Sequence, residues 1–317
     1  MIIMLMKKFS AVALGVAVLL GAAACGSGVA ANDKVSIIAS NYPFEFVLDR
    51  IVGDKAEVTV LVPPGVEAHD YELTPKQVAA INAADLVVFQ SGMTSAIDDA
   101  VSASTNENIL DTASTVTLLP FDRDEEADHD HDEADGHDHD HGNYDPHIWL
   151  DPNNLKQVAD AVLERLIEID AQNADYYKEN ARLLVSDLSE LDDDFKAGLA
   201  NCERTEFVTS HAAFGYLAHA YDLRQLAISG VTPESSPSPA RMADIQFLAK
   251  EYGITTIFTE TLASPALSET LARDLGLVTD VLDPIEGLSA QSRGNDYLEI
   301  MRANLDALRK ANDCRNK

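Results

Sequence analysis

Three of the nine histidines occupy positions that suit a metal site. His69, His147 and His211 each stand after a strand-like run or a buried-looking turn and just before a predicted helix. Asp283, in LVTDVLDPIEG, occupies the same kind of place. A single histidine near a strand end is more often a hydrogen-bonded structural residue than a ligand. Three imidazoles and one carboxylate together, however, form a suitable, approximately tetrahedral ligand set for Zn²⁺.

Five further histidines lie in one acidic stretch. They alternate with carboxylates and are His129, His131, His137, His139 and His141. Residues 122–140 contain eleven Asp or Glu, and the stretch has no hydrophobic periodicity. We therefore predict a loop over residues 122–143 that stays outside the packed core. Its His-x-His pairs could act as auxiliary, low-affinity metal ligands; a solubilising insertion with no role in transport is the alternative.

The elements that must position these residues are those of an α/β protein. From Val35 onwards, short β-branched runs alternate with helical stretches, which predicts a mainly parallel sheet. Asp151 and Pro152 provide a helix start signal after DPHIWL. Strand–helix alternation resumes with TEFVTS and continues to a final helix, DYLEIMRANLDALRKAND.

One long helix separates the two α/β regions. Its apolar residues recur at helical spacing and are Leu184, Leu188, Leu191, Phe195 and Leu199. At 1.5 Å per residue the helix would be roughly 40 Å long, which favours a rigid spine; an ordinary surface helix is the alternative. We predict an N-terminal lobe over 34–172, a connecting helix over 173–203 and a C-terminal lobe over 204–317. Ligands of open α/β sheets bind beyond the carboxyl ends of the strands, so the metal is expected in the cleft between the lobes.

The N-terminus resembles an export signal. Two lysines precede the apolar FSAVALGVAVLL and the small residues GAAAC, which predicts a signal peptide over residues 1–24. AAAC followed by GSG resembles a lipobox, so Cys25 would be lipidated and residues 25–33 would form a tether. Ordinary signal cleavage near Ala24 or Ala31 is the alternative. We expect the protein in the periplasm or on the outer face of the cytoplasmic membrane.

Two cysteines remain in the body of the chain. Cys202 precedes TEFVTS and Cys314 ends the last helical segment. Two thiols are a poor inventory for a thiolate metal site but suit one bridge in an exported protein. We predict that they form a disulfide.

Composition limits the partners. The chain of 317 residues is 46% apolar and 24% charged, as is usual for globular proteins. Its formal charge of −30 disfavours nucleic acid and anionic lipid and suits a protein that meets cations. We therefore expect no nucleic-acid partner, and membrane association only through a lipid anchor.

Six motifs together resemble a known family. They occur in chain order and are PPGVEAHDYELTP, DPHIWLDP, SHAAFGYLA, SGVTPESSPSPARMADI, FTETLASPALSETLARDLG and LDPIEG. In this order and spacing they are similar to the solute-binding proteins of bacterial zinc and manganese ABC importers. The resemblance covers nearly the whole mature chain. It implies two α/β lobes joined by one long helix, with the metal between the lobes.

The same resemblance implies a ligand set and a metal. The family ligands fall on His69, His147, His211 and Asp283. Manganese-type members carry Glu at the third position, so His211 indicates the zinc type. Imidazole suits Zn²⁺, whereas Mn²⁺ prefers more oxygen ligands. Zinc-type members often carry a His-rich loop before DPH, which favours metal capture by residues 122–143.

Several polar neighbours have weaker signals. Asp145 and Glu260 could orient ligating imidazoles; a turn-forming role for Asp145 and simple solvation for Glu260 are the alternatives. We do not expect Glu67 to be a ligand. His219, inside the helical FGYLAHAYD, is expected to be a surface or packing residue.

The resulting functional prediction is a carrier, not an enzyme. The chain would capture Zn²⁺ and deliver it, as a monomer, to the permease of an ABC importer. No GxxxxGK[ST] loop is present, so a separate ATPase would supply the energy. The alternatives are a manganese-type carrier, a zinc-dependent hydrolase, and a metal-buffering or adhesive surface protein. The chain lacks HExxH, which counts against the hydrolase.

Overall fold

The computed structural model describes residues 34–121 and 144–315. The predicted signal peptide, Cys25, the tether and the five loop histidines lie outside these residues. Among the described helices, none has the length and apolar character needed to cross a membrane.

The first sheet is built from the N-terminal part of the chain. Its parallel strands are β1 (Val35–Ala39), β2 (Ala56–Val60), β3 (Leu86–Phe89) and β4 (Ile109–Asp111), in the order β2-β1-β3-β4. The helices between them are α1 (Tyr42–Val52), α2 (Pro75–Ala83) and α3 (Ser95–Ser102), and the 3-10 helix η1 (Thr112–Thr115) follows β4. Every residue of β3 is buried, as expected for a central parallel strand covered on both faces.

The second sheet repeats this topology. Its parallel strands are β5 (Glu206–Thr209), β6 (Arg224–Ala227), β7 (Thr256–Thr259) and β8 (Val278–Val281), in the order β6-β5-β7-β8. Its helices are α6 (Gly215–Ala220), α7 (Pro239–Glu251), α8 (Ala266–Leu275) and α9 (Tyr297–Ala311). The predicted fold class, α/β with two mainly parallel sheets, is confirmed.

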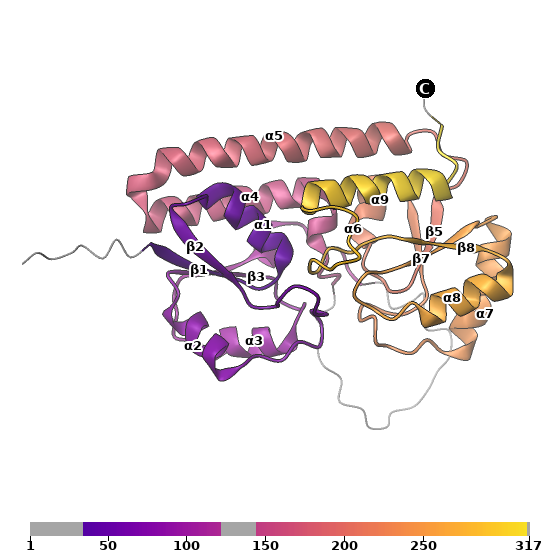
Figure 1. The fold of residues 1–317 in the computed structure, drawn as a ribbon, viewed down its shortest axis with the longest axis horizontal. Helices are drawn as coiled ribbons and strands as arrows, with labels where there is room; N and C mark the ends of the chain where they lie inside the picture. The colour runs from indigo at the N-terminus through magenta and orange to yellow at the C-terminus, as the bar shows by residue number, and fades with distance from the viewer. Residues whose placement is uncertain (1–33, 122–143, 316–317) are drawn as a thin grey trace, which may run out of the picture. The chain divides into compact units, whose positions relative to one another are not determined.

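In the chain, a helical hairpin separates the strands of the two sheets. It follows the 3-10 helix η3 (Ile148–Leu150) and comprises α4 (Pro152–Ile169), the 3-10 helix η4 (Ala171–Asn173) and α5 (Ala174–Leu199). Figure 1 shows α5 running from beyond the first sheet to the near side of the second, with α4 and α9 beside it. The predicted apolar positions Leu184, Leu188 and Phe195 are fully buried. Helix α5 therefore buries one face along its length and leaves other residues exposed, and its role as a rigid spine stays a prediction.

Three of the described helices begin with the same local chemistry. Thr74, Asp151 and Ser238 are N-caps whose side chains accept a hydrogen bond from a backbone N–H of the first turn. Proline follows each cap, where its missing N–H costs no helical hydrogen bond. These caps fix where the chain leaves each preceding loop.

A single large hydrophobic core joins elements on both sides of α5. Phe44 and Trp149, which precede α5, belong to the same buried cluster as Phe214 and Tyr297, which follow it. A smaller cluster around Val208 lies under α7 and α8. Because residues on both sides of α5 belong to the larger cluster, separating them would expose apolar surface.

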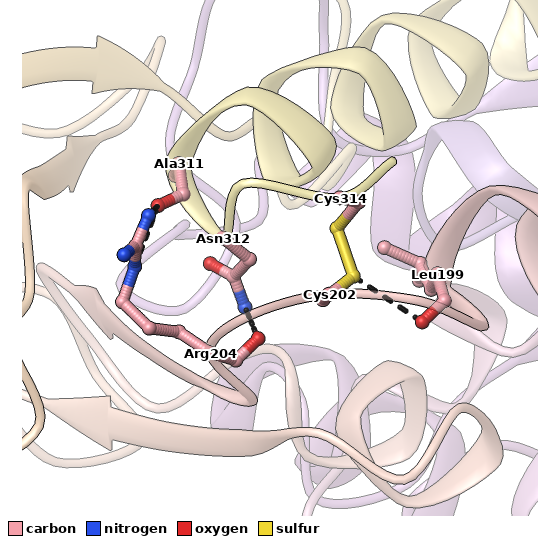
Figure 2. Close-up of a disulfide and its surroundings, with 6 residues drawn as sticks. All are labelled: Leu199, Cys202, Arg204, Ala311, Asn312 and Cys314. Atoms are coloured by element: carbon pink, nitrogen blue, oxygen red, sulfur yellow. Dashed lines mark hydrogen bonds between the residues drawn. A yellow bond between two sulfur atoms is a disulfide. The ribbon is translucent and has the colours of Figure 1, made fainter. Parts of the chain in front are cut away.

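The predicted disulfide joins the ends of two helices. Cys202 follows α5 and Cys314 follows α9, 112 residues apart in the chain. Figure 2 shows two further links beside it: the Arg204 guanidinium donates to the Ala311 carbonyl, and the Asn312 amide donates to the Arg204 carbonyl. The disulfide and these hydrogen bonds therefore join the same two segments, the end of α9 and the residues that follow α5.

Candidate metal centre

Four buried side chains converge from four loops. His69 lies between β2 and α2, His147 immediately before η3, His211 shortly after β5, and Glu286 between β8 and α9. Their side chains are at most 2% exposed, and one ligand atom of each lies within 4.8 Å of the others. The structure thus brings together the three predicted histidines with a carboxylate.

The spacing of these atoms fits a single small cation. The Nε2 atoms of His69, His147 and His211 lie 3.6, 3.4 and 3.3 Å from Glu286 Oε1. His69 Nε2 and His147 Nε2 are 3.2 Å apart. A tetrahedral Zn²⁺ with bonds near 2.0–2.1 Å requires ligand–ligand separations of about 3.3 Å. Glu286 Oε1 and His211 Nε2 are also buried without a hydrogen-bond partner among the described residues, which a metal ion would provide.

Two carboxylates lie beside two of the imidazoles. Asp145 Oδ1 lies 2.7 Å from His147 Nδ1, and Glu260 Oε1 lies 2.7 Å from His211 Nδ1. At His147, a proton held at Nδ1 by Asp145 leaves the Nε2 lone pair facing the centre. Asp145 and Glu260 thus each lie beside the Nδ1 atom of a predicted ligand, and their orienting role stays a prediction.

The approach of Asp145 depends on a glycine. A Cβ atom at Gly215 would lie 2.5 Å from Asp145 Oδ2, which is closer than atoms pack. Gly215 begins α6, so the helix that follows His211 can pack directly against the carboxylate that orients His147.

The surroundings shift the pKa values of the three histidines in different directions. Burial opposes the charged form of His147 and of His211, but carboxylates outweigh it and raise both pKa values: Asp145 and Glu286 act on His147, and Glu260 and Glu286 act on His211. Burial lowers the pKa of His69, although Glu286 partly opposes the effect. Burial also opposes the charge of Glu286, but the three imidazoles hold its pKa well below the usual range. The centre therefore favours an ionised carboxylate facing imidazoles.

The position of Asp283 corrects the sequence-based ligand set. Asp283 is 2% exposed, but its Oδ1 accepts the Ile285 N–H at 2.9 Å and its Oδ2 accepts the Ser292 hydroxyl at 2.9 Å. The carboxylate braces its own loop, and Glu286 occupies the place beside the histidines. The missed signal lay three residues further along the same LDPIEG motif.

Glu67 and His219 also have assignable places. Glu67 accepts the backbone N–H groups of His69 and Asp70, at 2.9 and 3.1 Å, and so shapes the His69 loop. Burial, with a contribution from the charge of Glu286, raises the pKa of Glu67 to about 8. His219 is exposed on α6 and lies outside the cluster.

The two parallel sheets and the His₃Glu cluster place this chain in the class of metal-binding α/β proteins. Two residues of the cluster precede α5 in the chain and two follow it. More specifically, residues 37–311 match the family model described as zinc-uptake complex component A, periplasmic, and the chain belongs to that family.

Named relatives agree with this membership. The chain is 36% identical over 311 residues to the high-affinity zinc uptake system protein ZnuA of Bacillus subtilis, covering 96% of this chain and 97% of the relative. It is 34% identical over 295 residues to the zinc-binding lipoprotein AdcA of Streptococcus pneumoniae, covering 92% of this chain but only 58% of AdcA. The Zn(II)-bound ZnuA-like domain of S. pneumoniae AdcA superposes with a TM-score of 0.72 at 31% identity, covering 88% of this chain and 99% of the domain. These relatives are named for zinc binding or uptake.

Proposed function

We propose that this chain binds Zn²⁺ outside the cytoplasmic membrane through His69, His147, His211 and Glu286 and delivers it to the permease of an ABC importer. The observation that carries the proposal is the convergence of three imidazole Nε2 atoms on one buried oxygen of Glu286, at 3.3–3.6 Å. Zinc is the cargo, and a separate ATPase supplies the energy.

The ligand types support zinc over manganese. Three nitrogen ligands and one carboxylate suit Zn²⁺, whereas Mn²⁺ prefers more oxygen. The relatives named for zinc uptake and zinc binding support the same metal.

The number of protein ligands supports a carrier over a hydrolase. Catalytic zinc sites keep a coordination position open for water or substrate, while four protein side chains fill a tetrahedral shell. The four ligands also come in two pairs: His69 and His147 precede α5, and His211 and Glu286 follow it. A small separation of these pairs would leave each with two ligands, which gives a route to release.

Release by a small movement suits the packing. The shared core and the spine α5 resist wide opening of the two halves. We propose modest movement on binding and release. Solution scattering profiles of the metal-free and zinc-bound protein should nearly superpose; a large difference between them would contradict this mechanism.

The regions outside the described residues have proposed roles too. Residues 1–24 would be an export signal, and Cys25 would carry a lipid that holds the protein, as a monomer, at the outer face of the membrane. Residues 122–143 would capture zinc weakly. Deleting residues 123–142 should preserve the tight site and lower the total zinc stoichiometry; an unchanged stoichiometry would contradict capture by the loop.

The experiment that tests the carrier site is a zinc titration against a chromogenic chelator. It would compare the metal-stripped protein with His211→Ala and with His219→Ala, a matched control on the exposed face of α6. One tight site that is lost in His211→Ala and kept in His219→Ala would support the proposal. Tight binding unaffected by His211→Ala would place the site elsewhere.

A further inference from the structure

Trp149 links the loops of two zinc-site residues that lie on opposite sides of α5 in the chain. It stands two residues after His147 and is fully buried. Its indole Nε1–H donates a hydrogen bond of 2.8 Å to the carbonyl of Pro284, which stands two residues before Glu286. This hydrogen bond involves no side chain of a zinc ligand, because it joins the Trp149 indole to the Pro284 carbonyl.

The loop that receives this bond has an unfavourable backbone conformation. Ile285 has a φ of 58°, in the left-handed region that β-branched residues rarely adopt, and its side chain is fully buried. Such conformations persist only where the surrounding structure holds them, and they occur often at binding sites. Glu286 follows directly, so the conformation of Ile285 sets the direction in which Glu286 leaves the loop.

Contacts from α9 hold the same loop from its other end. Asn304 accepts the Asp283 N–H at 2.9 Å and donates to the Asp283 carbonyl at 2.7 Å. The Asp283 carboxylate in turn accepts the Ile285 N–H at 2.9 Å. Asn304 on α9 therefore fixes the Asp283 backbone, the Asp283 carboxylate holds Ile285, and Trp149 holds Pro284 between them.

Trp149 is itself fixed on the side of His147. Its ring packs edge-on against the His147 ring, with centroids 5.4 Å apart, and against the Phe44 ring at 6.0 Å. Its carbonyl accepts the Tyr297 hydroxyl at 2.6 Å. A side chain that contacts one ligand and holds the loop of another can set the distance between them.

We infer that Trp149 is a positioning residue of the metal centre: its indole N–H holds the strained loop 283–286 so that the Glu286 carboxylate meets the imidazoles of His69 and His147. This role rests on the proposed function, because zinc affinity is its readout. Residues outside the ligand set that orient ligands typically change metal affinity about 10–100-fold when they are replaced.

A double-mutant cycle tests whether Trp149 acts through Glu286. Zinc affinity would be measured for the wild type, Trp149→Phe, Glu286→Gln and the double variant. Trp149→Phe keeps an aromatic ring and removes the indole donor. We expect it to weaken zinc binding about 10–100-fold in the wild-type background and less than about 3-fold in the Glu286→Gln background. An equal loss in both backgrounds, or no loss in either, would overturn the inference.

A matched control separates positioning from stability. Tyr177→Phe removes another buried hydrogen bond, from the Tyr177 hydroxyl to Asp170 at 2.6 Å, in the α4–α5 hairpin and away from the metal ligands. It should lower thermal stability while leaving zinc affinity unchanged. If wild-type protein and Glu286→Gln bind zinc equally well, the proposed ligand set fails; if only Trp149→Phe is without effect, the positioning role fails.

A measurement on the wild type keeps the inference testable if Trp149→Phe does not fold. Trp149 is the single tryptophan of the chain, so its indole N–H gives one NMR signal. Slow hydrogen exchange of this proton in both the metal-free and the zinc-bound protein would support a hydrogen bond that holds the loop in place before and after binding. Rapid exchange in either form would overturn the inference.

Discussion

The Asp145 carboxylate holds His147 at two points: Asp145 Oδ1 lies 2.7 Å from the ring Nδ1 and accepts the His147 backbone N–H at 2.9 Å. One carboxylate oxygen thus fixes both the main chain and the ring of a metal ligand. This double contact explains why the DPH triplet can present an imidazole from a loop, where a histidine would otherwise sample several rotamers.

The first prediction concerns this orienting contact. Asp145→Asn keeps the side-chain volume but removes the charge that holds the Nδ1 proton, so zinc affinity should fall about 10-fold or more. Glu260→Gln should have a similar effect through His211. Chelator competition checks both variants, with Asp244→Asn on α7 as a control away from the metal cluster. Unchanged affinity in both orienting variants would show that the imidazoles need no such support.

A second prediction separates Glu286 from Asp283. Glu286→Gln removes a ligand and should weaken zinc binding by more than about 100-fold, beyond the usual effect of orienting residues. Asp283→Asn should destabilise the protein by about 1 kcal/mol, because it alters the hydrogen bonds of the 283–292 loop, and change zinc affinity by less than about 10-fold. Calorimetry of both variants, with and without zinc, measures the two effects. The reverse ranking of affinities would restore Asp283 as the ligand.

The pattern of secondary structure made most of the fold predictable. Alternating β-branched and helical runs gave two parallel sheets, and the spacing from Leu184 to Leu199 gave a helix close to the observed α5. Each of the two predicted lobes, 34–172 and 204–317, contains one of the sheets, and a core cluster includes residues of both. Contacts such as those of Trp149 with Phe44 and Pro284 depend on side chains distant in sequence, which no local period reports.

The metal centre was predictable except where loop geometry decides. His69 and His211 were candidates because each follows a strand of a parallel sheet, and ligands of open α/β sheets bind beyond the carboxyl ends of the strands; His147 was a candidate because it stands just before a capped helix. Choosing between Asp283 and Glu286 required the backbone conformation of Ile285. Its positive φ could not be predicted from the sequence, because β-branched residues rarely adopt one. Sequence distance alone could not show which carboxylate turns towards the histidines.

The disulfide supports a third prediction. Replacing Cys202 and Cys314 with serine should lower the free energy of unfolding by up to about 4–5 kcal/mol, because the bridge closes a loop of more than 100 residues in the unfolded chain. The zinc affinity should change by less than about 3-fold, because neither cysteine orients a metal ligand. Replacing residues that orient ligands typically changes metal affinity about 10–100-fold. Denaturant unfolding and chelator competition check the two statements. Unchanged stability would mean that the Arg204 and Asn312 hydrogen bonds hold the helix ends without the bridge.

A fourth prediction is that zinc stabilises the protein less as the pH falls. Carboxylates raise the pKa of His147 and of His211 against the effect of burial, so protons compete with zinc beginning above the ordinary value of 6.5. In the metal-free protein, these two histidines add stability that is fully present below pH 6.5 and is lost as the pH rises through their folded-state pKa values. Glu286 adds stability that is present above pH 4.5 and is lost as the pH falls through its lowered pKa.

His147, His211 and Glu286 together therefore contribute most to the metal-free protein between pH 4.5 and 6.5, where zinc must displace protons from His147 and His211. Burial lowers the pKa of His69, so this histidine adds little proton competition there. The increase in melting temperature on zinc addition should accordingly be small in this window and grow as the pH rises to about 8, as deprotonation frees the ligands. Thermal unfolding with and without zinc across this range measures it, with His219→Ala as the control for an exposed histidine. A zinc-induced increase that is independent of pH would contradict a centre whose histidines lose protons on binding.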